Sequence, residues 1–371
     1  MNLPEPHDRF GVLVLSVVKH DYVARGVATH PRFKLTVVAD EADQPDWIHQ
    51  RNQQFADEHG IAYVRDVSKA IAEHDVQVAV VSSEAERHCA LSVQAAEAGL
   101  HIIQDKPMST SLTECDRVVE AVAQNKVKFL MWNRNLFPAV VQARDVIARG
   151  EVGDPYAFHV DFYFAKDAGP PKGSRDPGAP PMDWLETLKA AHITGADGGV
   201  GKEPMGELGV EGCYPLAYIA MLSGAKVCRV FARTTAHFHQ LYVDNGVEDL
   251  ATVSLEFENG VVGSLALGRI GAASHPDIGE IKLHILGPKG ALVISEARPE
   301  VGIYYRDQPA EEFKNQRLLD SENDYLLADS FARAIDTNSH TILDAPTSRA
   351  IAATVLAALE SSRTGNVVDV P

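Results

Sequence analysis

The stretch VLVLSVVKHDYVARGV, residues 12–27, decides the fold of this 371-residue chain. It reads as a buried β-strand that runs into a helix, and nucleotide-binding α/β proteins usually connect two such elements by a run of glycines. Here the first glycine after the strand is Gly26. Two interpretations follow: the chain binds a dinucleotide through a rebuilt loop, or it has lost the cofactor.

Strand and helix signals alternate as far as residue 133, which is typical of a parallel sheet with crossover helices. The apolar runs that predict strands are 11–16, 34–40, 62–64, 76–82, 101–104 and 128–132. Helical patterns lie between them at 43–59, 86–99 and 112–125. Six strands at this spacing predict a doubly wound parallel sheet, a Rossmann-type α/β domain, over residues 1–133.

The pattern changes after Gly153, and a stretch rich in proline and glycine, residues 165–184, predicts a long loop that covers a site. Hairpin turns at Asn259-Gly260 and 287–290 separate strand-like runs, so an antiparallel sheet is expected. The predicted strands are 156–164, 227–234, 249–258, 261–268, 280–286 and 291–295, and the predicted helices are 184–191, 207–222, 323–335 and 348–363. Residues 134–371 are therefore predicted to form an α+β domain with an open, mainly antiparallel sheet.

The charge and the apolar pattern of the chain limit the classes of partner that it is expected to bind. A net charge of −17 argues against a nucleic acid or an anionic membrane as partner, because both attract a basic surface. The chain lacks a signal-peptide pattern at its start and a spanning run of about 18 apolar residues, so a soluble, cytoplasmic protein that binds a small molecule is expected. The four cysteines (Cys89, Cys115, Cys213 and Cys228) are too widely spaced to suggest disulfides or a zinc cluster.

Four stretches resemble the Gfo/Idh/MocA oxidoreductases. They are AGLHIIQDKPMSTSLTECDRVVEAV (98–122), MWNRNLFPAVVQARDVIARGEVGDP (131–155), EDLATVSLEFENGVVGSLALG (248–268), and the ending that contains DSFARAI and LAALESSRTGNVVDVP. The resemblance implies an N-terminal Rossmann domain, a C-terminal open-sheet domain and NAD(P)-dependent oxidation or reduction of a sugar or polyol. It also implies a homodimer or homotetramer.

The motif Asp105-Lys106-Pro107 stands at the carboxyl end of the fifth predicted strand, where open α/β sheets place ligands. A lysine at that edge is suited to exchange a proton with a substrate hydroxyl. The resemblance implies this acid/base role for Lys106, and Asp105 replaces the family's usual glutamate beside the cofactor. The alternative is a surface lysine in a turn.

Asp40 ends the second predicted strand, 24 residues after Ser16. This is near the offset of about 20 residues at which an acidic side chain binds the ribose hydroxyls of a dinucleotide. A carboxylate there repels a 2′-phosphate, so NAD is favoured over NADP. The alternative is an aspartate that only caps the following turn.

Further cofactor contacts are implied by the resemblance. The run that includes Ser82, Ser83, Glu84 and His88 corresponds to the family's Thr-Pro-Asn-x-x-His segment, although only the hydroxyl residue and the histidine match. A histidine satisfied by backbone groups is the alternative for His88. Arg134 corresponds to the first arginine of the family's Asn-Arg-Arg and is a candidate for binding the nicotinamide amide or a substrate oxygen.

The opening stretch then has a specific interpretation. Ser16 stands where a fingerprint glycine is expected, and Val17 and Val18 crowd the turn. Lys19 and His20 supply charge that glycines lack, so these five residues predict an altered pyrophosphate clamp. The alternative for Lys19 is a solvated residue at the start of a helix.

On the substrate side, a helix in the family carries Asp-x-Gly-x-His-x-x-Asp. Glu207 falls at the first acid, Glu211 at the histidine and Tyr214 at the last acid; a second register instead aligns 212–216 with Gly-Cys-Tyr variants. Glu207 and Glu211 share a helical face, where two carboxylates repel each other unless they serve a site. They are candidates for binding hydroxyls, for a metal or for acid/base work, and a solvated acidic face is the alternative.

Other candidates rest on position. Trp132 ends the sixth strand and either stacks on a sugar ring or belongs to the core. Lys166, Trp184 and His192 lie in or after the long loop and are candidates for reaching the substrate. His237 and His239 stand at strand spacing, but they follow a strand rather than a pocket motif, and no metal is predicted.

Three functions remain. The first is an NAD-dependent dehydrogenase in which Lys106 deprotonates a hydroxyl and Glu211 or Tyr214 orients the substrate. The second is a redox-neutral enzyme (an isomerase, lyase or glycoside-cleaving enzyme) that recycles bound NAD. The third is a non-catalytic sugar sensor, against which Lys106 and Asp40 count, because a cofactor-free descendant needs neither.

Overall fold

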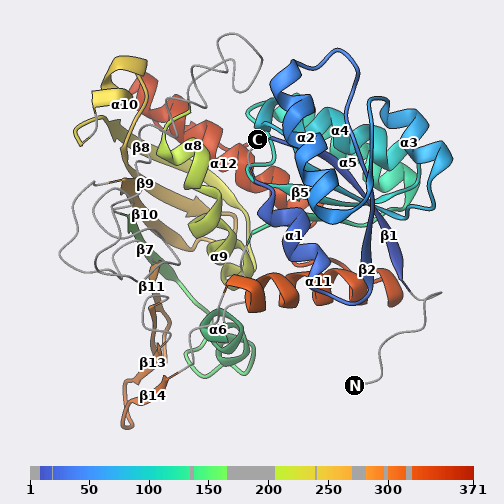
Figure 1. The fold of residues 1–371 in the computed structure, drawn as a ribbon. Coiled ribbons are helices and arrows are strands. Elements are labelled where there is room, and N and C mark those ends of the chain that lie inside the picture. The colour runs from blue at the N-terminus through green and yellow to red at the C-terminus, as the bar shows by residue number, and fades with distance from the viewer. Residues whose placement is uncertain are drawn as a thin grey trace, which may run out of the picture. The chain divides into compact units, whose positions relative to one another are not determined.

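The computed structural model describes residues 9–18, 20–133, 138–164, 205–238, 240–269, 281–295, 300–314 and 320–371. These residues form two compact units (Figure 1). The first unit contains the described residues up to 133 together with 320–352, and the second contains 138–164, the described residues of 205–314, and 353–371. By its contacts, the segment 320–352 therefore joins the residues that the sequence assigns to the first domain.

The first unit contains a six-stranded sheet in which every neighbouring pair is parallel. The strand order is β3-β2-β1-β4-β5-β6, so the order reverses between β1 and β4 as in a doubly wound fold. The strands are β1 (Phe10–Val17), β2 (Phe33–Ala39), β3 (Ala62–Val64), β4 (Val78–Ser82), β5 (His101–Asp105) and β6 (Phe129–Trp132). The predicted parallel fold of this part of the chain is confirmed.

The crossover helices are α1 (Tyr22–Ala28), α2 (Asp46–His59), α3 (Val67–Glu73), α4 (Ala85–Glu97) and α5 (Leu112–Asn125). Local sequence explains several of their ends. The side chain of Ser111 accepts a hydrogen bond from the amide of Glu114 and caps α5, and Gly60 ends α2 in the left-handed conformation.

Gly26, the first glycine of the opening stretch, has a packing role. Helix α11 (Asp320–Asp336) contacts α1 (Figure 1), and a Cβ atom on Gly26 would lie 2.9 Å from Asp324 Cβ and 2.9 Å from Trp132 Cζ2. Real Cβ atoms essentially never approach a neighbour so closely. The glycine therefore permits α1 to pack against Trp132 and α11.

The second unit contains a nine-stranded sheet in the order β14-β13-β12-β11-β7-β10-β9-β8-β15. Its neighbouring strands are antiparallel except for the parallel pair β7 and β10, so the sheet is mixed and mostly antiparallel, as predicted. The strands are β7 (Ala157–Phe164), β8 (Val227–Thr235), β9 (Leu250–Phe257), β10 (Val262–Arg269), β11 (Lys282–Leu286), β12 (Gly290–Ser295), β13 (Glu300–Tyr305), β14 (Glu311–Lys314) and β15 (Val368–Asp369).

One face of this sheet is buried in the core of the unit, as the burial pattern of β9 shows. In β9, Ala251, Val253, Leu255 and Phe257 are buried and alternate with exposed residues, which is the period of a half-covered strand. The described residues of this unit's chain segments contain the helices α6 (Pro138–Ala148), α8 (Glu207–Glu211), α9 (Cys213–Ser223), α10 (Gln240–Asn245) and the end of α12 (Ala345–Thr364). Helices α8 and α9 contact the central strands β7, β9 and β10.

The predicted helix 207–222 is in fact two helices that meet at Gly212. Pro215 lacks the amide that would bond the carbonyl of Glu211, so a continuous helix would lose a hydrogen bond at this point. Position 212 also leaves no room for a side chain, because a Cβ atom there would collide with the Leu208 carbonyl oxygen. The break places Glu207 and Glu211 together on α8 and Tyr214 on α9.

The predicted long loop 165–184 and the predicted helix 184–191 lie outside the described residues. Among the residues that are described, none of the helices combines the length and apolar composition needed to span a membrane.

Candidate functional site

The carboxyl ends of β1, β2, β4 and β5 form one edge of the first unit's sheet, and most of the predicted cofactor residues lie there. Ser16 occupies the last part of β1 with φ +60°, and the pairing of β1 with β4 shifts register between Leu15 and Val17. A left-handed backbone is the conformation that glycine adopts most readily. The chain thus keeps a glycine-like backbone at the fingerprint position with serine in place of glycine.

Arg87, on the first turn of α4, links three of these strand ends. Its Nη1 lies 2.7 Å from Asp40 Oδ1, its Nη2 lies 3.2 Å from Ser16 Oγ and 3.1 Å from Glu84 Oε2, and its Nε donates to Glu84 Oε1. We call Ser16, Asp40, Glu84 and Arg87 the arginine latch. Burial disfavours the charged guanidinium, but the bonds to Asp40 and Glu84 outweigh it and raise the pKa of Arg87.

Asp40 is fully buried and accepts two further hydrogen bonds. The amide of Glu41 donates to Oδ1 over 2.9 Å, and Asn52 Nδ2 donates to Oδ2 over 3.0 Å. Asn52 also accepts the amide of Val17 at 2.6 Å, so it connects helix α2 to the β1 loop. Asp40 is therefore more than a turn cap, because it fixes α2, α4 and the end of β1 around one carboxylate.

The Asp105 carboxylate lies between the β1 loop and Lys106. Oδ2 is 2.5 Å from His20 Nδ1, and Oδ1 accepts the backbone amide of Lys106 at 2.8 Å. Burial opposes ionisation of this carboxyl, but the nearby charges of His20, His88 and Lys106 hold its pKa below the ordinary value. The Lys106 side chain is itself buried, with 5% of the residue exposed, so the alternative of a surface lysine is wrong.

His88 contacts backbone carbonyls on both sides of its ring. Nδ1 lies 2.8 Å from the Pro107 oxygen, and Nε2 lies 3.0 Å from the Ser83 oxygen. A carbonyl oxygen only accepts, so both bonds form together when each ring nitrogen carries a proton. The ring ties the loop after β4 to the loop after β5, which is the backbone-satisfied arrangement; a direct cofactor contact of His88 stays a prediction.

The two serines of this loop have different surroundings. Ser82 Oγ is buried and has no hydrogen-bond partner among the described residues, whereas Ser83 Oγ donates to the carbonyl of Glu84 at 3.0 Å. A buried hydroxyl without a partner calls for a bound water or ligand group. Ser82 is thus the predicted cofactor residue in this loop with an unused hydrogen-bonding group.

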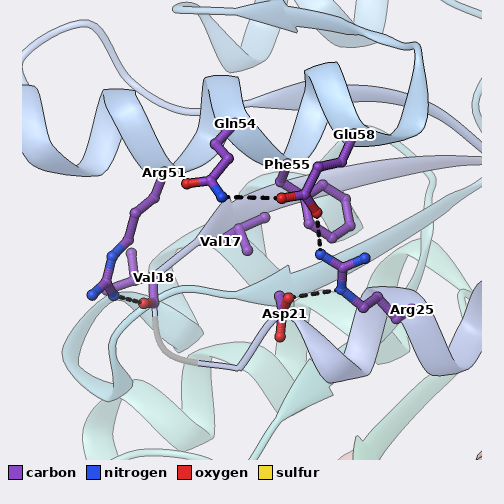
Figure 2. A pocket seen from close by; sticks show the side chains of 8 residues that line it. All are labelled: Val17, Val18, Asp21, Arg25, Arg51, Gln54, Phe55 and Glu58. Atoms are coloured by element: carbon purple, nitrogen blue, oxygen red, sulfur yellow. Dashed lines mark hydrogen bonds and ion pairs between the residues drawn. The ribbon is translucent and has the colours of Figure 1, made fainter. Parts of the chain in front are cut away.

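Val17 and Val18 line a pocket of about 270 Å³ between α1 and α2 (Figure 2). Arg25 lies between Asp21 and Glu58 in this pocket, and Arg51 donates to the Val18 carbonyl. The two arginines and two carboxylates balance in charge. Both valines are buried, so the side chains that replace glycine pack towards α2.

In the second unit, Glu207 and Arg269 form a buried ion pair, and both residues are 1% exposed. Arg269 Nε lies 2.6 Å from Glu207 Oε1, its Nη2 lies 3.2 Å from Oε2, and the Tyr242 hydroxyl donates to Oε1. Glu211 Oε1 is 3.9 Å from Arg269 Nη2. The guanidinium thus explains how two carboxylates share one helical face, and the alternative of a solvated acidic face is wrong.

Burial also raises the pKa values of two other polar side chains in this cluster, Tyr242 and Glu248. It raises the pKa of Tyr242, with the Glu207 charge adding to the effect, so the hydroxyl keeps its proton and donates it. Burial raises the pKa of Glu248 as well, although its Oε1 accepts the Leu208 amide at 3.0 Å. A side chain on Gly206 would overlap the Glu248 carboxylate, so the glycine admits this carboxylate to the start of α8.

The remaining predicted residues divide into two groups. Trp132 is fully buried, which favours the alternative that it belongs to the core. Tyr214, in α9, is partly exposed, and its ring lies 6.2 Å from that of Phe162. His237 follows β8, and its backbone amide bonds Asp249. Outside the described residues lie Lys19, Arg134, Lys166, Trp184, His192 and His239. Within the described ranges, no three His, Cys, Asp or Glu side chains gather in a way that would hold a metal ion.

Sequence reasoning missed the partners of the predicted acids. Arg87 stood inside the run 82–88 without a motif to mark it, and Asn52 lay on an ordinary helical face. Arg269 did leave a signal, because a charged residue that ends an apolar strand needs a carboxylate if it is buried. Tyr242 left none, since it becomes part of the cluster only through the fold.

Comparison with known protein families agrees with this geometry. The model GFO_IDH_MocA, described as an oxidoreductase family with an NAD-binding Rossmann fold, matches residues 15–133. The model of the GFO/IDH/MocA C-terminal domain matches residues 201–293. The chain belongs to the Gfo/Idh/MocA family. It therefore has an NAD-binding Rossmann domain and is a member of a family of oxidoreductases.

Relatives of this Gfo/Idh/MocA protein include dehydrogenases. The uncharacterized oxidoreductase YrbE of Bacillus subtilis is 25% identical over 299 residues, which cover 78% of this chain and 77% of YrbE. The scyllo-inositol 2-dehydrogenase (NAD(+)) of the same organism is 24% identical over 293 residues, which cover 78% of this chain and 74% of that enzyme.

Solved structures of the same fold cover almost the whole chain. An oxidoreductase from Agrobacterium radiobacter in complex with NAD+, L-tartaric acid and magnesium matches with a TM-score of 0.78 at 16% identity, over 98% of both chains. Levoglucosan dehydrogenase in complex with NADH matches with a TM-score of 0.76 at 20% identity, over 98% of this chain and 99% of that one. At these identities the likeness shows the fold.

Proposed function

We propose that this Gfo/Idh/MocA protein is an NAD-dependent dehydrogenase that oxidises a hydroxyl group of a sugar, polyol or glycoside, with Lys106 as the acid/base. The observation that carries the proposal is the buried Lys106 at the carboxyl end of β5, next to an ionised Asp105. The relatives named as inositol and levoglucosan dehydrogenases support a carbohydrate-like substrate. A homodimer or homotetramer remains part of the proposal.

The residues present fit a dinucleotide despite the missing glycines. Ser16 has the left-handed backbone of a fingerprint glycine, and Val17 and Val18 pack towards α2. The unpartnered Ser82 hydroxyl and the buried Asp40 lie at the ends of strands that neighbour β1. The residues proposed to hold the cofactor are Ser16, Val17, Val18, Lys19, His20, Asp40, Ser82, Ser83, Glu84, His88, Asp105 and Arg134.

When bound, NAD supplies the acceptor for a hydride from the substrate carbon. Lys106 accepts the hydroxyl proton on its neutral Nζ during oxidation and returns it during reduction, so that the C–OH group becomes a carbonyl. Asp105 holds the Lys106 backbone amide and thereby fixes the start of this turn. In the proposal Glu211 or Tyr214 orients the substrate, as their places in the family's helix motif imply.

The test compares Lys106→Met with Lys69→Met, which changes an exposed lysine on α3. Lys106→Met is expected to lower kcat by about 100-fold or more, the usual weight of a positioned acid/base, while NAD affinity changes little. Lys69→Met should behave as wild type. Full activity of Lys106→Met would remove the assigned acid/base.

A second measurement separates net oxidation from recycling of bound cofactor. The purified protein is titrated with NAD(H), and a panel of inositols, sugars and glycosides is followed at the NADH absorbance band. Net oxidation predicts NADH formation with one or more substrates. Substrate conversion without NADH would favour the redox-neutral enzyme, and the absence of both NAD(H) binding and conversion would contradict an enzymatic function.

A further inference from the structure

The arginine latch spans the switch point of the first unit's sheet. Asp40 follows β2, Ser16 lies in β1 and Glu84 follows β4, and these three strands are neighbours in the order β2-β1-β4. The Arg87 guanidinium bonds all three residues and so lies across three adjacent strand ends. Ligands of open α/β sheets bind outside the carboxyl ends of strands at such a point.

Within the latch, Asp40 already accepts as many hydrogen bonds as a carboxylate normally does. Its two oxygens face Arg87 Nη1 and Nη2, the Glu41 amide and Asn52 Nδ2, at 2.7, 3.3, 2.9 and 3.0 Å. A carboxylate offers about four acceptor positions. A ribose hydroxyl can therefore hydrogen-bond to Asp40 only if one of these donors moves away. Among them, the Arg87 side chain has access to solvent, because 20% of it is exposed.

The charges of the latch do not balance. Asp40 and Glu84 are buried carboxylates, and Arg87 supplies one positive charge between them. The latch thus carries one surplus negative charge. A ribose with free 2′- and 3′-hydroxyls can donate to a carboxylate, whereas a 2′-phosphate would bring more negative charge to this edge.

We propose that Glu84 and Arg87 are specificity-determining residues for the adenosine ribose of the cofactor, in addition to Asp40. Glu84 accepts hydrogen bonds from the Arg87 guanidinium, which is then not available to bind a 2′-phosphate. The latch therefore selects NAD(H) over NADP(H). The inference rests on the proposed function, because it takes the first unit to bind a nicotinamide dinucleotide. It adds that helix α4, and not only the end of β2, sets the choice between the two cofactors.

Release of Arg87 should weaken the preference for NADH over NADPH. Glu84→Gln keeps the shape of the side chain but removes its charge, so the latch becomes neutral and the guanidinium is held by one carboxylate. Arginine binds phosphate through two parallel hydrogen bonds. NADPH affinity is expected to rise about tenfold or more, as when one charge-assisted hydrogen bond is gained, and to rise by a larger factor than NADH affinity does.

The experiment measures the dissociation constants of NADH and NADPH by fluorescence titration of the full-length protein. The matched control is Glu86→Gln, which removes the same charge two residues along and lies outside the latch. The ratio of the two constants should shift in Glu84→Gln and stay within about twofold of wild type in Glu86→Gln. Asp40→Asn makes the same charge change at the other end of the latch and should shift the ratio in the same direction.

A double variant tests whether Arg87 is the group released. In Glu84→Gln/Arg87→Gln the gain in NADPH affinity should disappear, because no guanidinium remains to bind the phosphate. An unchanged ratio in Glu84→Gln, an equal shift in Glu86→Gln or a gain that survives in the double variant would overturn the inference. Wild-type protein that binds NADH, with any of these results, leaves the proposed function standing; a wild type that binds neither cofactor overturns both.

Discussion

His20 Nδ1 lies 2.5 Å from Asp105 Oδ2, and this contact connects the loop that lacks glycines to the turn that carries Lys106. The histidine follows β1 and the aspartate ends β5, two strands separated in the sheet by β4. Asp105 is fully buried and His20 is largely buried. A histidine that follows β1 therefore contacts a buried carboxylate beside the proposed acid/base.

The first prediction concerns acid stability. The folded pKa of Asp105 is below its ordinary value, so its stabilising effect is complete above that value, about 3.9, and is lost as the pH falls through the folded pKa. Asp105→Asn is expected to lower the free energy of unfolding by roughly 3 kcal/mol at pH 7, and by progressively less below pH of about 4. Thermal denaturation from pH 7 to pH 3 measures the difference.

Asp336→Asn is the control for this series. Asp336 pairs with Arg32 at the surface, and its pKa is also lowered, chiefly by that hydrogen bond. Solvent screens the pair, so the variant should cost less than about 1 kcal/mol at any pH. A loss in Asp105→Asn that is the same at pH 7 and pH 3 would contradict the assigned cause.

The second prediction tests the backbone at Ser16. A residue with a side chain loses roughly 1–2 kcal/mol in the left-handed conformation, and β-branched residues fare worst. Ser16→Gly should therefore fold with stability within about 1 kcal/mol of wild type, because relief of strain offsets the greater freedom of glycine when unfolded. Ser16→Val should lose at least about 2 kcal/mol by the same unfolding measurement. Ser16→Ala separates the hydroxyl from the backbone effect, and equal stabilities of the Gly and Val variants would refute the idea.

Much of the order of the strands was predictable because apolar periodicity records burial, but β13, β14 and β15 of the second sheet were not predicted. The strand at 62–64 and the helix at 112–125 have the predicted bounds, and the other predicted strands differ by a few residues at their ends. The helix 207–222 could not be predicted as two pieces from periodicity, because both pieces are apolar and the break depends on Pro215 and the close packing of Gly212. Long-range pairing, such as the parallel contact of β7 with β10, leaves no local signal at all.

The candidate site was predictable to the extent that its residues stand at strand ends. Asp40 and Asp105 follow from their positions, since carboxyl ends of parallel strands meet at one edge. Their partners do not, because Arg87 reaches Asp40 across 47 positions in sequence and His20 reaches Asp105 across 85. The sequence therefore identifies these two carboxylates by their positions at strand ends. Their partners Arg87 and His20 are identified only in the folded structure.

The third prediction compares two glycines at the start of α8. A methyl group on Gly206 would overlap the Glu248 carboxylate, which also accepts the Leu208 amide, so Gly206→Ala should displace this contact at a cost of about 1–3 kcal/mol. A Cβ on Gly209 would meet the flexible end of Met205 at 3.2 Å, so Gly209→Ala should stay within about 1 kcal/mol of wild type. Chemical denaturation of both variants measures the contrast, and equal effects would refute the proposed role of Gly206.

The fourth prediction concerns the buried pair of Arg269 and Glu207. Arg269→Met leaves the Glu207 charge buried without its guanidinium, so the free energy of unfolding should fall by about 3–5 kcal/mol. Arg229→Met removes an arginine from an exposed pair with Glu256 and should cost less than about 1 kcal/mol.

A further variant distinguishes loss of charge balance from loss of packing. Glu207→Gln/Arg269→Met removes both buried charges and keeps a side-chain oxygen at position 207 to accept the Tyr242 hydroxyl. Because most of the cost of Arg269→Met is the unpaired carboxylate, this double variant should recover a large part of the lost stability. If it unfolds at the same denaturant concentration as Arg269→Met, packing of the guanidinium, and not its charge, holds α8 against β10.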